Sequence, residues 1–140
     1  MPKKVALVGH CGPDSSYLRM TIAKAGRDIQ VLSADDDGEL KRVLDGGVDL
    51  LLLNRQLDYG FDEQEGVALI RKLRAAHPRV KLMMVSNYPD TQAAAVAAGA
   101  LPGFGKRELS SPRVLELIRG ALAEDAAAAA ARDASAEARA

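Results

Sequence analysis

The sequence predicts a doubly wound α/β fold, in which a five-stranded parallel sheet is flanked by helices. Four consecutive leucines, residues 50–53, lie between Asp49 and Asn54. An apolar run of this kind is typical of a strand that is buried on both faces of a parallel sheet. Short apolar runs also alternate along the chain with segments of helical periodicity, and this alternation favours a parallel sheet covered by helices.

Each predicted strand is a short apolar run, and each is followed by signals for a helix. The strands are expected at residues 5–8, 29–32, 48–53, 80–85 and 101–104. The helices are expected to begin at Asp14 or Ser15, within 35–37, before Val67, at Asp90, and at Ser111-Pro112. Their inward faces are predicted from helical spacing to be Leu18, Ile22 and Ala25; Leu40, Val43 and Leu44; Val67, Ile70 and Leu73; and Leu115, Ile118 and Leu122.

The chain divides into one domain, residues 1–122, and an alanine-rich segment, residues 123–140. The second segment contains no large apolar residue and carries scattered charges. Alanine favours the helix, but this segment has nothing to bury. We expect it to be a helical extension of the last helix or a disordered tail.

Composition argues against several classes of protein. Lys and Arg together number 19, as do Asp and Glu, so the net charge is zero and no basic patch for nucleic acid is expected. The single cysteine excludes an internal disulfide and fits a reducing cytoplasm. No signal-peptide layout and no apolar run of ~20 residues is present. We therefore expect a cytoplasmic protein that neither binds nucleic acid nor spans a membrane.

Polar residues follow four of the predicted strands. Gly9 and His10 come after the first, Asn54 after the third, Ser86 after the fourth and Lys106 after the fifth. In open parallel sheets, ligand-binding and catalytic groups collect at the carboxyl ends of the strands. These residues are therefore the candidates for a shared site.

This order of residues resembles the receiver domain of bacterial two-component response regulators, over about residues 4–122. The resemblance is carried by Ser86, by Gly99-Ala100 before the fifth strand, by Lys106, and by the spacing from the first strand to Gly26. It implies a receiver-type, flavodoxin-like fold. In that family an acidic pair after the first strand binds magnesium and an aspartate after the third strand accepts the phosphoryl group. A Ser or Thr and a Lys, here Ser86 and Lys106, contact the phosphate.

The sequence departs from the family pattern at the decisive positions. Gly9 and His10 stand in place of the acidic pair, and Asn54 in place of the phospho-acceptor. Gly103 takes the place of the switch aromatic, with Phe104 one residue later, and Arg107 replaces the usual proline. An amide is a poor nucleophile, and magnesium is usually held by carboxylates. We interpret the chain as a pseudo-receiver without metal or cofactor, in which phosphorylation would require aspartate at residues 9, 10 and 54 together.

Several residues have more than one interpretation. The amide of Asn54 can bind Ser86 or a backbone carbonyl in a structural role, which is favoured, or it can bind a ligand. Asp58 can be a displaced phospho-acceptor, although it lies four residues beyond Asn54. The acidic residues of the loop, Asp58, Asp62, Glu63 and Glu65, match no calcium-loop spacing and are expected to be solvated. Cys11 can be a thiolate sensor beside Lys106, but an inert thiol is the simpler interpretation.

The same substitutions change the expected charge of the site. With Gly9, His10 and Asn54 in place of carboxylates, Lys106 dominates, and a protonated His10 would add to it. An anion site formed by Ser86, Lys106, Asn54 and His10 is expected, unless Asp14 or Asp58 folds inward and cancels the lysine.

The function expected is that of a stand-alone receiver-like protein in phosphorelay or two-component signal transduction. It would act by protein contact with a sensor kinase or a downstream effector, without being an enzyme. The resemblance also implies that a homodimer would form through the surface of the fourth and fifth helices. The alternatives are a receiver phosphorylated at Asp58 and a small-anion or ligand sensor with a flavodoxin-like fold.

Overall fold

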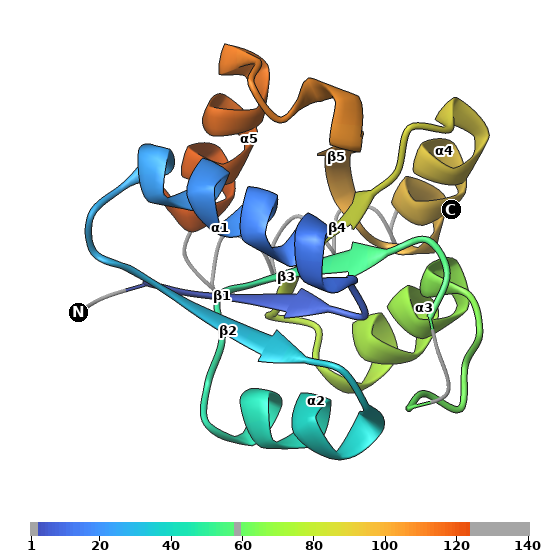
Figure 1. Cartoon of the computed structure of the whole chain (residues 1–140). Coiled ribbons are helices and arrows are strands. Elements are labelled where there is room, and N and C mark those ends of the chain that lie inside the picture. The colour runs from blue at the N-terminus through green and yellow to red at the C-terminus, as the bar shows by residue number, and fades with distance from the viewer. Residues whose placement is uncertain (1–2, 58–59, 124–140) are drawn as a thin grey trace.

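The computed structural model describes residues 3–57 and 60–123, which form a sheet covered by helices on both faces (Figure 1). The strands run in the spatial order β2-β1-β3-β4-β5, and all neighbouring pairs are parallel. This arrangement confirms the predicted doubly wound α/β fold. The elements are β1 (Lys3–Val8), α1 (Gly12–Ala25), β2 (Ile29–Ala34), α2 (Asp37–Asp45), β3 (Leu50–Asn54), α3 (Gly66–Ala76), β4 (Lys81–Val85), α4 (Pro89–Ala98), β5 (Leu101–Phe104), the 3-10 turn η1 (Lys106–Glu108) and α5 (Pro112–Ala123).

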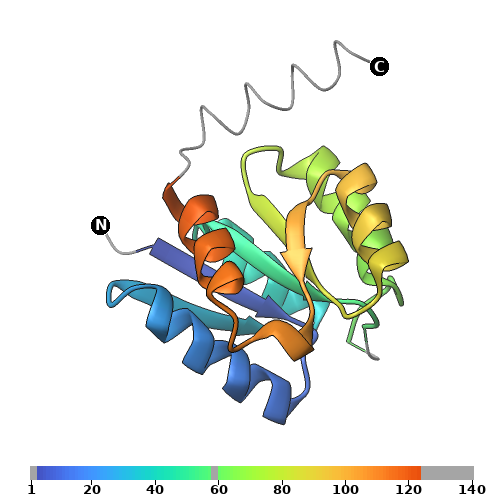
Figure 2. The ribbon, with the colours of Figure 1, turned by 90° about the horizontal axis from the view of Figure 1, so that it is seen from above.

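The leucines of β3 divide the core into two layers. Leu50 and Leu52 pack with α1 and α5 on one face of the sheet, and Leu51 and Leu53 pack with α2, α3 and α4 on the other. Figure 2 shows α1 and α5 lying together over one face. All four leucines are fully buried, as expected for a central strand whose alternate side chains point to opposite faces.

Two helices begin earlier than the sequence indicates. α1 begins at Gly12 rather than at Asp14 or Ser15, and α4 begins at Pro89 rather than at a capping Asp90. Both have proline in the first turn, where its fixed φ suits the helix and its missing N–H leaves no donor unpaired. Neither Asp14 nor Asp90 caps its helix, because each lies inside the first turn.

The predicted inward face of α5 is confirmed at Ile118 and Leu122 and is wrong at Leu115. Val114, Ile118, Ala121 and Leu122 are buried, whereas Leu115 is only half-buried. The predicted starts of α2 and α5 are confirmed. The Asp36 carboxylate accepts a hydrogen bond from the Glu39 N–H at 2.7 Å, and Pro112 is the first residue of α5. The predicted segment 123–140 lies outside the described residues except for Ala123, the last residue of α5.

The connection from β3 to α3 is packed against the core through its apolar residues. Leu57 and Phe61 are each only 6% exposed and join the core on the α2–α3 face. Gln56 and Glu65 form an antiparallel bridge at the base of the loop. Asp62 and Glu65 are exposed as expected, while Glu63 pairs with Lys72. Asp58 lies outside the described residues.

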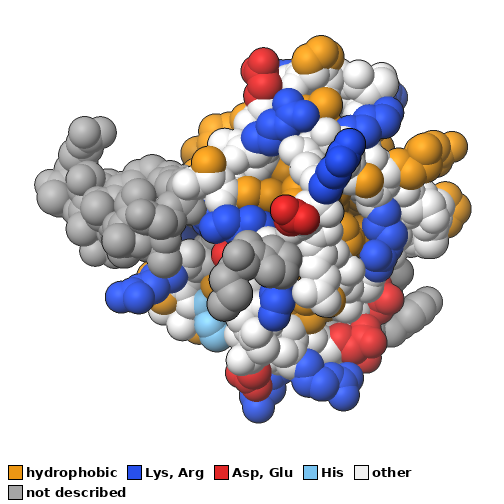
Figure 3. All heavy atoms as spheres, turned by 90° about the vertical axis from the view of Figure 1, so that its left-hand side faces the viewer, with side chains coloured by type: hydrophobic (Ala, Val, Ile, Leu, Met, Phe, Trp, Pro, Cys, Tyr) orange, Lys and Arg blue, Asp and Glu red, His pale blue; other side chains and the backbone are white. Residues whose placement is uncertain are grey.

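The outer surface carries charges of both signs. On the face formed by the amino-terminal ends of the strands, Lys and Arg side chains are separated by acidic and uncharged ones (Figure 3). Within residues 3–57 and 60–123, none of the helices has the length and apolarity needed to cross a membrane.

Candidate functional site

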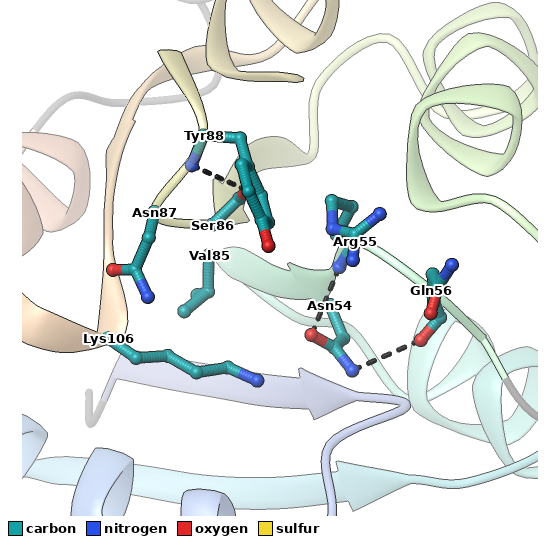
Figure 4. A pocket seen from close by; sticks show the side chains of 8 residues that line it. All are labelled: Asn54, Arg55, Gln56, Val85, Ser86, Asn87, Tyr88 and Lys106. Carbon is teal, nitrogen blue, oxygen red and sulfur yellow. Dashed lines mark hydrogen bonds between the residues drawn. The ribbon is translucent and has the colours of Figure 1, made fainter. Parts of the chain in front are cut away.

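A cavity of about 280 Å³ lies at the carboxyl ends of β3 and β4 (Figure 4). It contains three of the predicted site residues, Asn54, Ser86 and Lys106, which come from the ends of β3 and β4 and from η1. Gly9 and His10 are not among its lining residues. The full lining is Asn54, Arg55, Gln56, Val85, Ser86, Asn87, Tyr88 and Lys106.

The amide of Asn54 is occupied by backbone contacts. Its Nδ2 donates to the carbonyl oxygens of Gly9 and Gln56, both at 3.1 Å, and its Oδ1 accepts from the Arg55 N–H at 3.0 Å. Of the partners considered from the sequence, the side chain uses backbone carbonyls and not Ser86. Both amide hydrogens are therefore used to connect β3 to the loop after β1 and to its own following loop.

Gly9 adopts a backbone conformation that disfavours the aspartate found in the family. Its φ is +72°, in the left-handed region, and a Cβ built on it would lie 2.5 Å from Cδ2 of Leu57. The apolar part of the loop after β3 thus occupies the space beside Gly9. A carboxylate here would need both a strained φ and a displaced Leu57.

His10 points into the protein interior, so the prediction that it lines the pocket is wrong. The side chain is 7% exposed, and its Nε2 lies 2.8 Å from the carbonyl oxygen of Leu52. Nε2 therefore carries the proton in the neutral tautomer, and Nδ1 is buried without a hydrogen-bond partner in the described part of the chain. Burial lowers the pKa of His10 below 6.5, opposed by the hydrogen bond to Leu52, and nearby Lys106 lowers it further.

Lys106 lines the cavity and forms an ion pair with Asp14. Its Nζ lies 2.6 Å from Oδ2 of Asp14, in the first turn of α1. The hydrogen bond from Lys106 is the main reason that the pKa of Asp14 is lowered. The expectation that Lys106 alone makes the site positive is therefore wrong, because Asp14 folds inward. Cys11 is exposed, and its role as a thiolate sensor stays a prediction.

Two cavity residues were missed from the sequence. The guanidinium carbon of Arg55 lies 4.8 Å from the centre of the Tyr88 ring, an arrangement suited to a cation–π interaction. The Tyr88 N–H donates to the hydroxyl oxygen of Ser86 at 3.2 Å. A cation directly after Asn54 and an aromatic residue two positions after Ser86 were the available signals, but the proximity of their side chains depends on the loops.

The position of the switch aromatic is filled from another element. Phe104 is buried in the core on the α1–α5 face, while Gly103 leaves room for the side chain of Gln92 from α4. Nε2 of Gln92 donates to the carbonyl oxygens of Met84, Ser86 and Phe104 at 2.9, 3.1 and 3.2 Å. A Cβ at residue 103 would overlap the Met84 carbonyl and approach Oε1 of Gln92.

The donor set of the cavity suits an anion better than a metal ion. Its described lining contains two cations and no Asp or Glu. Within residues 3–57 and 60–123 there is also no cluster of three or more His, Cys, Asp or Glu side chains suited to a metal. Magnesium prefers carboxylate and other hard oxygen ligands in an octahedron, and such a set is not assembled by these residues.

The strand order and the position of the polar site at the strand ends identify the fold. The chain has the fold of the receiver domains of response regulators. No family model matches the sequence, and no curated protein sequence matches it.

Particular solved structures share this fold. NtrX from Brucella abortus matches with a TM-score of 0.71 and 18% identity, over 96% of this chain and 30% of NtrX. The signal receiver domain of an HD domain-containing protein from Pseudomonas fluorescens Pf-5 matches with a TM-score of 0.70 and 18% identity, over 86% of this chain and 87% of that domain. The non-phosphorylated receiver domain of the stress response regulator RcsB from Escherichia coli matches with a TM-score of 0.68 and 15% identity, over 86% and 95% of the two chains. At these identities the similarity establishes the fold and not the activity.

Proposed function

We propose that the chain is a receiver-like module of two-component signal transduction that acts through protein contacts and is not phosphorylated. The observation that carries the proposal is Asn54. At the position where a receiver has its acceptor aspartate, an amide stands with both hydrogens bonded to backbone carbonyls. Such a group neither attacks phosphorus nor holds magnesium. The module has no enzymatic activity of its own in this proposal.

A partner surface is expected on exposed apolar side chains. Tyr17 and Met20, one turn apart on α1, are 61% and 60% exposed. Tyr88, which directly precedes α4, and Val96 of α4 are 58% and 44% exposed. Grouped apolar residues at a surface favour association with another protein. The partner in this proposal is a sensor kinase or a downstream effector, and a second copy of the chain at α4 is the homodimer alternative.

The experiment that tests the proposal is incubation with acetyl phosphate and magnesium, followed by measurement of the intact mass. We expect no gain of a phosphoryl group, while a receiver domain with aspartate at the acceptor position gains one in the same solution. A stable gain that maps to any residue at the strand ends would contradict the proposal. A gain that maps to Asp58 would instead support the displaced-acceptor alternative.

A further inference from the structure

We propose that the cavity at the ends of β3 and β4 is a binding site for a small oxyanion, with the guanidinium of Arg55 as its main ligand. The expected ligands are phosphate and carboxylate groups. This inference goes beyond the proposed signalling function, because it assigns a ligand to the site and does not depend on a protein partner.

Arg55 is held in place but keeps its donors available. Its backbone N–H is bonded to Asn54, and its guanidinium lies over the Tyr88 ring at 4.8 Å. No hydrogen bond or ion pair of the described residues uses the guanidinium itself. Stacking on an aromatic face leaves the edge of the guanidinium free for a planar, bidentate contact with a carboxylate or a phosphate.

The charge around the cavity is positive even with the Lys106–Asp14 pair intact. The lining contains Arg55 and Lys106 and no carboxylate, and one carboxylate, that of Asp14, touches Lys106 from outside it. Two positive charges and one negative charge leave a net charge of +1. No carboxylate of the described residues forms an ion pair with Arg55, although Glu65 and Asp90 line a neighbouring hollow that Arg55 also lines. The site is therefore assigned to Arg55 and not to Lys106, which is paired with Asp14.

Two neutral side chains add oriented donors. Oδ1 of Asn87 accepts from the Arg107 N–H at 3.0 Å, so its NH2 group is the free end of the amide. The hydroxyl oxygen of Ser86 accepts from Tyr88, and its hydrogen remains to be donated. Figure 4 shows Asn87, Ser86, Tyr88, Arg55 and Lys106 around the same cavity. Asn54 positions Arg55 by accepting its backbone N–H, but it does not bind the anion, because both of its amide hydrogens are donated to backbone carbonyls.

The test is thermal unfolding of the full chain in inorganic phosphate, in acetate, in sodium chloride and in magnesium chloride, at matched ionic strength. At ten times the Kd, bound phosphate should raise the Tm by about 4 °C. Arg55→Gln should lose this gain, and Arg79→Gln should keep it. Arg79 is a matched control because it is exposed and precedes β4 at the opposite end of the sheet. An equal gain in acetate and in phosphate would show that the site accepts both carboxylate and phosphate groups, and a gain in phosphate alone would assign it to phosphate groups.

Two further measurements keep the result independent of the folding of one variant. In the unmodified protein, the Arg55 Nε–H and Asn87 Nδ2–H2 resonances should shift saturably with phosphate. Asp14→Asn should bind phosphate several times more tightly, because it releases Lys106 to the ligand. The proposal is overturned if Arg55→Gln keeps the full gain, if chloride does as well as phosphate, or if magnesium stabilises more than phosphate. Phosphorylation in the acetyl phosphate experiment would contradict the signalling proposal and leave this titration unaffected.

Discussion

At the scale of single residues, the Asn54 side chain connects the loops after β1 and β3 at the site by hydrogen bonds. Its Nδ2 is a donor to two carbonyl oxygens, those of Gly9 and Gln56. A carboxylate has no hydrogen to donate to either carbonyl. Replacing Asn54 by the aspartate of a receiver therefore removes both hydrogen bonds. It also places a negative charge next to the two carbonyl oxygens.

We expect Asn54→Asp to lower the free energy of unfolding by about 1–3 kcal/mol and to leave the protein unphosphorylated. Urea unfolding and intact mass measure the two effects. Gln56→Glu makes the same change of amide to carboxylate at an exposed side chain and should cost little. If Asn54→Asp is as stable as the unmodified protein, the bonds of Asn54 to the backbone are unimportant.

Gly9 is a second residue whose identity follows from its surroundings. We expect Gly9→Ala to cost about 1–3 kcal/mol, because φ is +72° and the new Cβ meets Leu57. Leu57→Ala should recover part of this cost in a double-mutant cycle. Gly12→Ala is the control, since a Cβ there meets nothing within 4 Å and should be neutral or stabilising in α1. The triple aspartate variant is thus expected to be destabilised, and the requirement of all three aspartates for phosphorylation stays a prediction.

The third prediction at this scale concerns pH. The folded pKa of His10 is lowered from 6.5, so the neutral form is favoured in the native state. Its contribution to stability is complete above pH 6.5 and is lost as the pH falls through the lower folded pKa, because the unfolded chain takes up the proton first. Lys106 and Asp14 are the charged groups that act on it, in opposite directions.

Denaturant unfolding as a function of pH measures this contribution. We expect the unfolding free energy to decline below pH 6.5, and His10→Gln to flatten that decline. His77→Gln removes the other histidine and should keep the slope of the unmodified protein. A slope that is unchanged in His10→Gln would show that burial of His10 has no part in the acid sensitivity.

At the scale of elements, Gln92 connects α4 to the carboxyl ends of β4 and β5. Its Nε2 donates to three carbonyl oxygens, and the absence of a side chain at Gly103 makes this possible. The buried Oε1 has no hydrogen-bond partner among the described residues. The contact fixes the relative position of these three elements at the place where a receiver has its switch aromatic.

We expect Gln92→Ala to cost about 1–3 kcal/mol, because buried carbonyls lose their donor. Hydrogen exchange should increase at the carboxyl ends of β4 and β5 before the rest of the sheet. Gln64→Ala, at an exposed glutamine of the loop before α3, should change neither quantity. Uniform exchange over the sheet in Gln92→Ala would contradict the role of Gln92 as a local connection.

At the scale of the whole molecule, α1 is connected to segments from the other end of the chain. Arg119 of α5 donates to the carbonyl oxygens of Ala25 and Lys24 at the end of α1, both at 3.0 Å. Lys106 pairs with Asp14 at the other end of α1. The first helix is thus held at both ends by residues from the last quarter of the sequence. Of the pocket residues, Lys106 comes from η1, so the lining of the pocket is complete only when η1 is in place.

The positions of the strands and of the carboxyl-end residues were predicted from the sequence because both follow from local patterns. An apolar run such as residues 50–53 needs burial on both faces, whichever helices provide it, and its end then places Asn54 at the edge of the sheet. The same reasoning placed Ser86 and Lys106 at the cavity, where they are found.

Contacts between distant segments were decided only by the tertiary structure. His10 turns inward because the Leu52 carbonyl, 42 residues away, accepts its hydrogen bond. Asp14 neutralises Lys106 and Arg55 stacks on Tyr88 because of the paths of the connecting loops, which no periodicity in the sequence encodes. Helical and strand repeats specify which face of an element is buried, but the partner of a polar side chain depends on which loops meet at the end of the sheet.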